Sequence, residues 1–349
     1  MEFQKPIVVA FLLSTLILTA FADCTCDLEE NNGNDSTVLK YKLIALACIL
    51  IAGGIGVSLP FAGNIFQALR PENDSFFLVK AFASGVILAT GFIHILPDAF
   101  ESLTSPCLKE HPWGDFPFTG FVAMVATILT LLIETSASAY QLKVQTEVAA
   151  KLVGVEDEEK NAGNVDVHMH ANNHGHVHGF MLPPVNDSEV HRYRIVSQVL
   201  ELGIIVHSVI IGLSLGASKS PETIKPLIIA LSFHQFFEGL GLGGCIYQAK
   251  IKSLAITLMG AFFTLTTPSG IVVGILISKT YKENSTNALI VEGVLNAASS
   301  GILIYMALVD LLSPDFKNPR MQKSKILLIG SHVFLLLGAG LMSLLAKWA

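Results

Sequence analysis

Eight long, nearly uncharged stretches divide this sequence. They lie at about 43–69, 76–99, 117–138, 195–217, 226–248, 253–278, 288–312 and 326–346. A helix needs about 20 mostly apolar residues to cross the hydrocarbon core of a bilayer, and each stretch meets that length. A membrane β-barrel would instead show shorter segments of alternating polarity. The sequence therefore predicts an all-α fold, a polytopic membrane bundle of about eight transmembrane helices.

The overall composition agrees with this prediction. Only 14% of the residues are charged, whereas 52% are hydrophobic. The formal net charge is −6, and no basic tract provides the footprint that nucleic-acid binding needs. We therefore expect the lipid bilayer as the surroundings of the chain and no nucleic acid as a partner.

The N-terminal 23 residues are typical of a secretory signal peptide. They contain Lys5, an apolar run at 7–21 and small residues at Ala20 and Ala22. The alternative is an uncleaved first anchor. Residues 24–42 would then form a short extracytosolic segment, followed by helices 1–3 within 43–138.

A long polar loop is predicted at 139–194, between the third and fourth helices. It has an acidic run at 156–159 and is expected to be largely disordered. Its candidate metal-binding residues are His168, His170, His174, His176 and His178. Neutral imidazoles bind metal ions, so the loop could be a cytosolic sensor or buffer; the alternative is a solvated spacer.

The distribution of lysine and arginine favours one orientation in the membrane. These residues concentrate in the loop at 139–194 and in the connection before the eighth helix, and such loops are usually cytosolic. Both termini would then lie outside, and 195–349 would hold helices 4–8 with a short extracytosolic tail. The plasma membrane is the expected location.

Five cysteines are too few for a disulfide scaffold. Cys48 and Cys245 lie inside apolar stretches, where a thiol usually serves as a small packing residue. Cys24, Cys26 and Cys107 are expected outside the cytosol, where one disulfide bond could persist. The sequence does not assign the pairing.

Ionisable side chains within the fourth and fifth stretches are candidates for function. Glu201 and His207 lie in the fourth, and His234, Gln235 and Glu238 lie in the fifth. A charge inside a bilayer is costly unless it faces a partner or a wet cavity. His234 and Glu238 share a helix face, and imidazole with carboxylate suits zinc and similar ions. The alternative is a hydrogen-bonded contact between two helices.

Two segments resemble a known family. HSVIIGLSLG at 207–216 and HQFFEGLGLGG at 234–244 resemble the signature helices of the ZIP family of zinc and iron transporters, in its plant-type branch, and the similarity covers nearly the whole chain. The resemblance implies transport of divalent metal ions (zinc, and iron, manganese or cadmium) into the cytosol, with the metal as substrate and no resident cofactor. It implies a transport site lined by His207, Ser208, Gly212, His234, Gln235 and Glu238.

The direct ligands expected among these residues are His207, His234 and Glu238. Family members that hold two adjacent ions have an extra acid four residues after the fourth-helix histidine and another in the sixth helix. Here the first position is Ile211, and the sixth stretch, 253–278, contains no acid. These departures argue against a second ion at the midplane.

The second stretch ends in GFIHILPDAFESL, which places His94, Asp98 and Glu101 on one helix face. Ordinary capping at a membrane boundary would explain these residues. The resemblance instead implies an entrance, where the acidic groups would raise the local concentration of cations. Glu134, Glu201, Glu292 and His332 are expected to be boundary or interhelical partners rather than ligands.

Other classes of function fit the sequence less well. A phosphate-binding loop is absent, so ATP is not expected to drive transport. An intramembrane zinc-dependent hydrolase would usually carry H-E-x-x-H, which is missing, so we expect no enzyme activity. A metal exporter of the cation-diffusion type usually has six spans, and a metal receptor is a further alternative. The oligomeric state is open, with a homodimer as one possibility.

Overall fold

The fold is a bundle of helices that are long and apolar enough to cross a membrane. A computed structural model describes residues 35–64, 73–160, 185–278 and 285–347. Within these residues the candidate spans are Ser36–Ala62, Asp74–Leu103, Phe118–Tyr140, Tyr193–Ala217, Ile224–Gln248, Ser253–Ile277, Thr286–Phe316 and Lys325–Ala346. The predicted all-α membrane fold is therefore confirmed. The proposed signal peptide, Cys24 and Cys26 lie outside the described residues.

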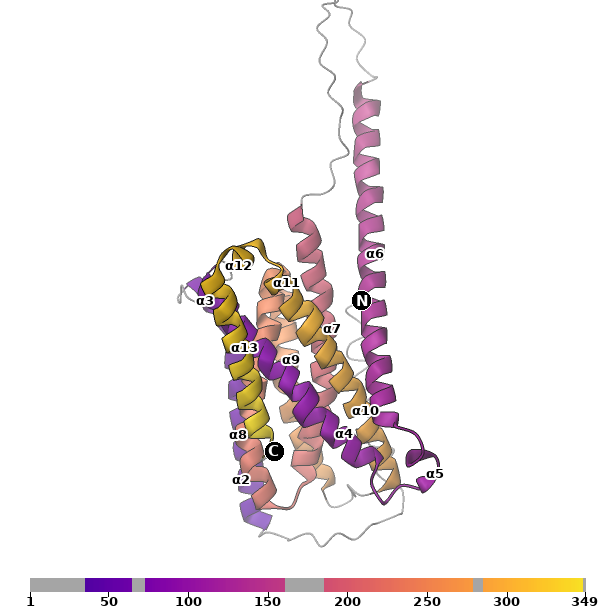
Figure 1. The fold of residues 1–349 in the computed structure, drawn as a ribbon, viewed down its shortest axis with the longest axis vertical. Helices are drawn as coiled ribbons and strands as arrows, with labels where there is room; N and C mark the ends of the chain where they lie inside the picture. The colour runs from indigo at the N-terminus through magenta and orange to yellow at the C-terminus, as the bar shows by residue number, and fades with distance from the viewer. Residues whose placement is uncertain (1–34, 65–72, 161–184, 279–284, 348–349) are drawn as a thin grey trace, which may run out of the picture.

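The helices follow one another along the chain (Figure 1) as α2 (Asp35–Ser58), η1 (Leu59–Asn64), α3 (Asp74–Ala89), η3 (Thr90–Ile95), α4 (Leu96–Leu103), α5 (Glu110–Trp113), α6 (Phe118–Lys160), α7 (Val185–Ala217), α8 (Pro221–Gln248), α9 (Ser253–Ile277), α10 (Thr286–Tyr305), η4 (Met306–Leu312), α11 (Ser313–Phe316), α12 (Pro319–Lys323) and α13 (Lys325–Ala346). Both η3 and η4 are π-helical. Such segments shift the register of a helix and often occur at functional sites.

The two ends of the bundle differ in shape. At the α4–α5 end a short connection leads into α6, and at the α6–α7 end α6 projects well beyond the other helices (Figure 1). The prediction of a disordered loop is wrong for 139–160 and 185–194, which are helical. Residues 139–160 are rich in Ala, Leu, Lys, Glu and Gln, which favour helix. The loop histidines lie outside the described residues.

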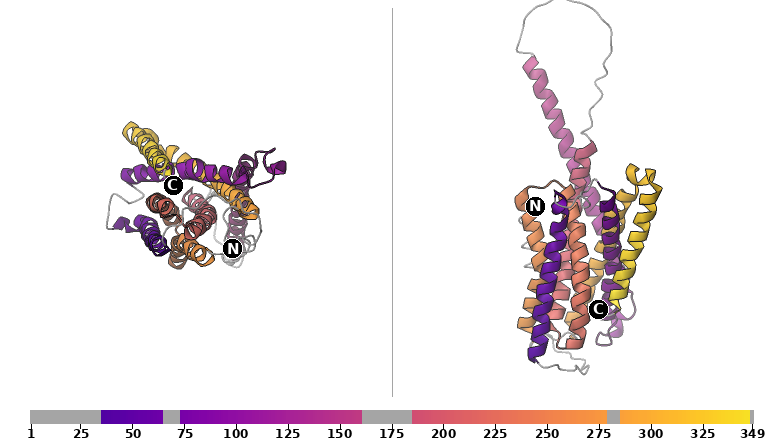
Figure 2. Two further views of the ribbon diagram at one scale, coloured as in Figure 1. Left: turned by 90° about the horizontal axis from the view of Figure 1, so that it is seen from below. Right: turned by 90° about the vertical axis from the view of Figure 1, so that its left-hand side faces the viewer.

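The helices pack in two groups, which lie side by side when the bundle is viewed along its length (Figure 2). In the first group α2 packs against α8 and α9, and α7 packs against α9. In the second, α3 packs against α13, and α10 packs against α6 and α4. The groups meet where α10 contacts α7 and where α3 contacts α8.

An apolar cluster lies between the two groups. It includes Ile87 of α3, Ile204 of α7, Leu242 of α8 and Leu303 of α10, all buried. Buried polar residues lie on the same four membrane spans, on the α4–α5 side of these positions: His94, His207, His234 and Asn296. The cluster therefore separates those residues from the α6–α7 end.

The cysteines follow the sequence prediction where the structure describes them. Neither Cys48 nor Cys245 is disulfide-bonded, and Cys245 is buried among apolar residues. Cys107 is disulfide-bonded, and its partner lies outside the described residues.

Candidate functional site

Three buried imidazoles lie close together in the middle of the bundle. The ring centroid of His207 in α7 is 5.8 Å from that of His234 in α8. The ring of His94 in η3 is 6.0 Å from His207 and 5.8 Å from His234. Two of these residues come from the first helix group and one from the second. The site therefore lies at the interface between the groups.

The placement of His94 corrects the sequence prediction. The sequence predicts it at an outer mouth with Asp98 and Glu101, at the end of an apolar stretch that runs to about 99. The span instead continues to Leu103, so His94 lies nine residues inside its end. At about 1.5 Å per helical residue, this is a depth of about 13 Å.

Glu238 adds a carboxylate one helical turn from His234. It is fully buried, and neither of its carboxylate oxygens has a hydrogen-bond partner. Both ring nitrogens of His207, Nε2 of His94 and Nδ1 of His234 also lack one. A buried polar atom left in this state costs about 1–3 kcal/mol. The concentration of such atoms in one place favours a site for a cation, which imidazole and carboxylate lone pairs can bind.

The present geometry is close to that of a metal site but is not closed around an ion. Among the described residues, no three His, Cys, Asp or Glu side chains stand at ligand distance from a common point. Imidazoles that share a tetrahedral zinc ion have ring centroids about 5 Å apart, since the Zn–N bond is about 2.0–2.1 Å. The observed 5.8–6.0 Å is somewhat larger. Small movements of the three side chains would bring the rings to that spacing.

Two residues predicted to line the site also contact neighbouring helices. Gln235 accepts a hydrogen bond of 3.2 Å from Thr267 of α9, and its side chain lies against Gly53 of α2. A Cβ atom at Gly212 would lie 2.5 Å from the backbone oxygen of Thr267. Both positions therefore serve contacts between helices. Ser208 is buried on the Gly212 side of α7, one turn away.

Asp98 and Glu101 continue from the site toward the α4–α5 end. Asp98 Oδ2 lies 3.9 Å from His94 Nδ1, and its side chain is 47% exposed. Glu101 lies nearly one turn further along α4 and is exposed. The two acids therefore remain candidates for the mouth, whereas His94 belongs to the buried cluster.

Sequence reasoning missed two buried polar residues of α10, Asn296 and Ser299. Neither Asn296 Oδ1 nor Ser299 Oγ has a hydrogen-bond partner. Their signal in the sequence was weak, because neutral polar residues are common in membrane helices. An amide in the middle of an apolar stretch was the one available indication.

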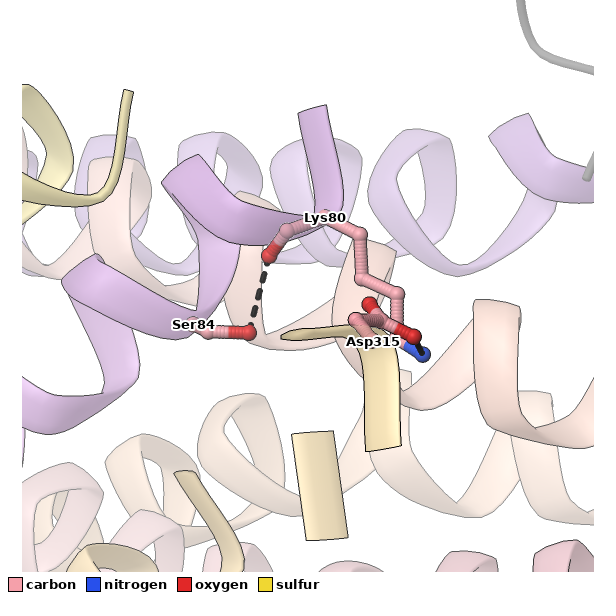
Figure 3. A network of polar contacts seen from close by, with 3 residues as sticks. All are labelled: Lys80, Ser84 and Asp315. Carbon is pink, nitrogen blue, oxygen red and sulfur yellow. Dashed lines mark hydrogen bonds and ion pairs between the residues drawn. The ribbon is translucent and has the colours of Figure 1, made fainter. Parts of the chain in front are cut away.

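A buried ion pair near the α6–α7 end was also not expected from the sequence. Lys80 Nζ of α3 lies 2.9 Å from Asp315 Oδ1 of α11, and Ser84 Oγ donates a 2.8 Å hydrogen bond to the Lys80 backbone oxygen (Figure 3). The Lys80 ammonium is also 5.6 Å from the ring centroid of Tyr193 in α7. The pair joins α3 of the second group to α11 and lies beside α7 of the first group.

One of the acids predicted to connect helices does so. Tyr305 of α10 donates a 2.6 Å hydrogen bond from its hydroxyl to Glu134 Oε2 of α6. This contact confirms the interpretation of Glu134 as an interhelical partner and sets it apart from the imidazole cluster.

Comparison with known proteins identifies the family. A family model described as "ZIP Zinc transporter" matches residues 39–346. The chain belongs to the ZIP family. The resemblance inferred from the segments at 207–216 and 234–244 is thereby confirmed, as is the multi-pass membrane architecture.

Curated relatives of this ZIP protein align over nearly their whole length. Zinc transporter 3 of Arabidopsis thaliana is 53% identical over 326 residues, which cover 93% of this chain and 90% of that protein. Zinc transporter 5 of Oryza sativa subsp. japonica is 49% identical over 351 residues, covering 99% and 98%. Fe(2+) transport protein 2 of Arabidopsis thaliana is 45% identical over 345 residues, covering 98% and 97%.

Proposed function

We propose that this ZIP protein moves divalent transition-metal ions, zinc first among them, across the membrane by way of His94, His207, His234 and Glu238. The names of the relatives, which include zinc transporters and an iron transport protein, support the class of substrate. The observation that carries the proposal is the set of buried nitrogen and oxygen atoms without hydrogen-bond partners at this one place.

The chemistry of the four side chains suits an ion in transit. A bare dication in hydrocarbon is prohibitively costly, so a carrier must replace its water shell with ligands at depth. Three imidazoles and one carboxylate match the nitrogen and oxygen ligands of zinc and similar ions. The carboxylate offsets one unit of charge. We expect exchange to be possible because the set includes no thiolate, the ligand that holds zinc in many permanent structural sites.

The distribution of charge supports import. Asp98 and Glu101 would face the outside at the α4–α5 end and raise the local concentration of cations. The lysine- and arginine-rich connections would place the α6–α7 end in the cytosol, and the plasma membrane is the location we propose. The apolar cluster would block release to the cytosol until the two helix groups move. Such movement would also separate His94 from His207 and His234.

Zinc flux into proteoliposomes that contain a trapped zinc indicator tests the proposal. We expect zinc to enter down its gradient without chemical change, and the Glu238→Gln variant to lose this flux. The exposed histidine His332 of α13 offers a matched control, since His332→Ala alters an imidazole outside the cluster. A wild-type protein that binds zinc without flux would be a receptor, and flux only toward the outside would indicate an exporter.

A further inference from the structure

The helix α10 faces both helix groups at the level of the buried histidines. Ser300 Oγ donates a 3.1 Å hydrogen bond to the Gly91 backbone oxygen in η3. A Cβ atom at Gly203 of α7 would lie 2.6 Å from Cγ2 of Ile302. A Cβ atom at Gly301 would lie 2.2 Å from a backbone oxygen of α6. Three sides of α10 therefore face η3, α7 and α6.

Asn296 and Ser299 lie on the side of α10 that remains. With Leu303 they form one face, since they are separated by three and four residues. That face lies between the directions of Ser300 and Ile302 and away from Gly301. Leu303 accordingly packs in the apolar cluster with residues of α3, α7 and α8. The face therefore points between η3 and α7.

The depth of the two residues also matches that of the histidines. At about 1.5 Å per residue, Ser299 and Asn296 lie about 6 and 10 Å beyond Leu303 toward the α4–α5 end. His207 lies about 4.5 Å beyond its own cluster residue, Ile204, and His94 about 10 Å beyond Ile87. Asn296 and Ser299 therefore share a level with the imidazoles.

Both side chains carry an oxygen atom that the protein does not satisfy. Asn296 is 4% exposed and Ser299 is fully buried, and Asn296 Oδ1 and Ser299 Oγ have no hydrogen-bond partner. Buried oxygen atoms are normally hydrogen-bonded, and a group that is not needs an explanation. Here the explanation is available in the nearby cation site.

We propose that Asn296 and Ser299 supply neutral oxygen donors to the metal ion on the α10 side of the histidine cluster. The inference rests on the proposed function and adds a fourth helix to the site. Neutral oxygens add ligands without adding charge, so they would raise the coordination number of the bound ion. Harder ions such as Mn²⁺ favour oxygen ligands, so these residues would widen the range of ions accepted.

Four variants separate this role from helix packing. Asn296→Leu keeps a similar volume and removes the oxygen, whereas Asn296→Asp keeps an oxygen at the same place. Ser299→Ala removes the hydroxyl. Ser331→Ala is the matched control, because Ser331 of α13 is also fully buried with an unpartnered Oγ but lies outside the cluster. Each variant is assayed for zinc uptake in proteoliposomes, with the inserted protein quantified, and for the Mn²⁺ concentration that halves this uptake.

We expect Asn296→Leu to raise the KM for zinc about tenfold, because the cation loses one ligand. The half-inhibiting Mn²⁺ concentration should rise by a larger factor than the zinc KM. Ser299→Ala should cause a smaller shift in the same direction. Asn296→Asp should restore the zinc KM, and Ser331→Ala should leave both values unchanged.

Two results would overturn the inference. One is an Asn296→Leu protein with both values within about twofold of wild type. The other is an Asn296→Asp protein as defective as Asn296→Leu, which would indicate packing. If Glu238→Gln still abolishes flux in either case, the proposed function stands without this inference. Normal flux in Glu238→Gln would instead remove the proposed function itself.

Discussion

Replacing Lys80 by methionine should destabilise the protein by about 3–5 kcal/mol, because the change leaves the Asp315 carboxylate buried without its counter-charge. The two side chains are 5% and 12% exposed, and the charged atoms lie 2.9 Å apart (Figure 3). At an effective dielectric constant of about 20, their attraction is about 6 kcal/mol. The free-energy cost of removing both charges from water offsets much of this attraction. The intact pair therefore stabilises the protein by far less than the loss of one partner destabilises it.

Equilibrium unfolding of the purified protein in mixed micelles measures this effect. The double variant Lys80→Met with Asp315→Leu should recover most of the loss, since no isolated charge remains. Asp74 and Arg320 supply a matched control: they also lie 2.9 Å apart but are 57% and 50% exposed. Arg320→Met should therefore cost less than about 1 kcal/mol. Equal effects of Lys80→Met and Arg320→Met, or no recovery in the double variant, would refute the reasoning.

Three further predictions concern packing, the site and the loop. Gly216→Ala should destabilise the protein by about 1–3 kcal/mol, because its Cβ would lie 2.3 Å from the Ile271 backbone oxygen. Gly340→Ala should not destabilise it, since nothing lies within 4 Å of a Cβ there. The same unfolding assay measures both variants, and equal destabilisation would contradict the packing of Gly216. His94→Ala should raise the zinc KM by about tenfold, and a normal KM would return His94 to a mouth role. Deletion of 166–179 should keep zinc uptake while changing its response to excess zinc, and loss of uptake at normal surface expression would oppose this.

The membrane helices could be predicted from the sequence because apolar length determines which segments span a bilayer. Their ends were harder to predict. The first helix begins at Asp35 rather than at about 43, and its Lys42 is buried, with Nζ 2.6 Å from the Gly216 backbone oxygen. That oxygen is near the C-terminus of α7, where a cation is favourable. A lysine inside a helix could not be distinguished from a boundary lysine without knowledge of this partner.

The candidate site was predictable only where local helix geometry and depth in the membrane determine it. His234 and Glu238 share a face by local helix geometry, and the histidine of α7 was recognisable from its depth. The contribution of His94 depends on which helices are neighbours, which helical periodicity does not reveal. Gln235 was assigned to the site from the family resemblance, and its contact with Thr267 could not be predicted because it depends on which helices are neighbours. Asn296 carries no charge and therefore gave a weaker signal than the acids did.

The most direct test of the account is zinc uptake by the Glu238→Gln variant. The substitution keeps the size of the side chain and its capacity for hydrogen bonds but removes the negative charge of a fully buried group. We expect zinc flux per inserted protein to fall by about tenfold or more, because interactions with charged groups at buried sites exceed those of neutral ones. His332→Ala, measured in parallel, should transport normally. Near-normal zinc flux through a correctly inserted Glu238→Gln protein would contradict the claim that the ion passes through this cluster.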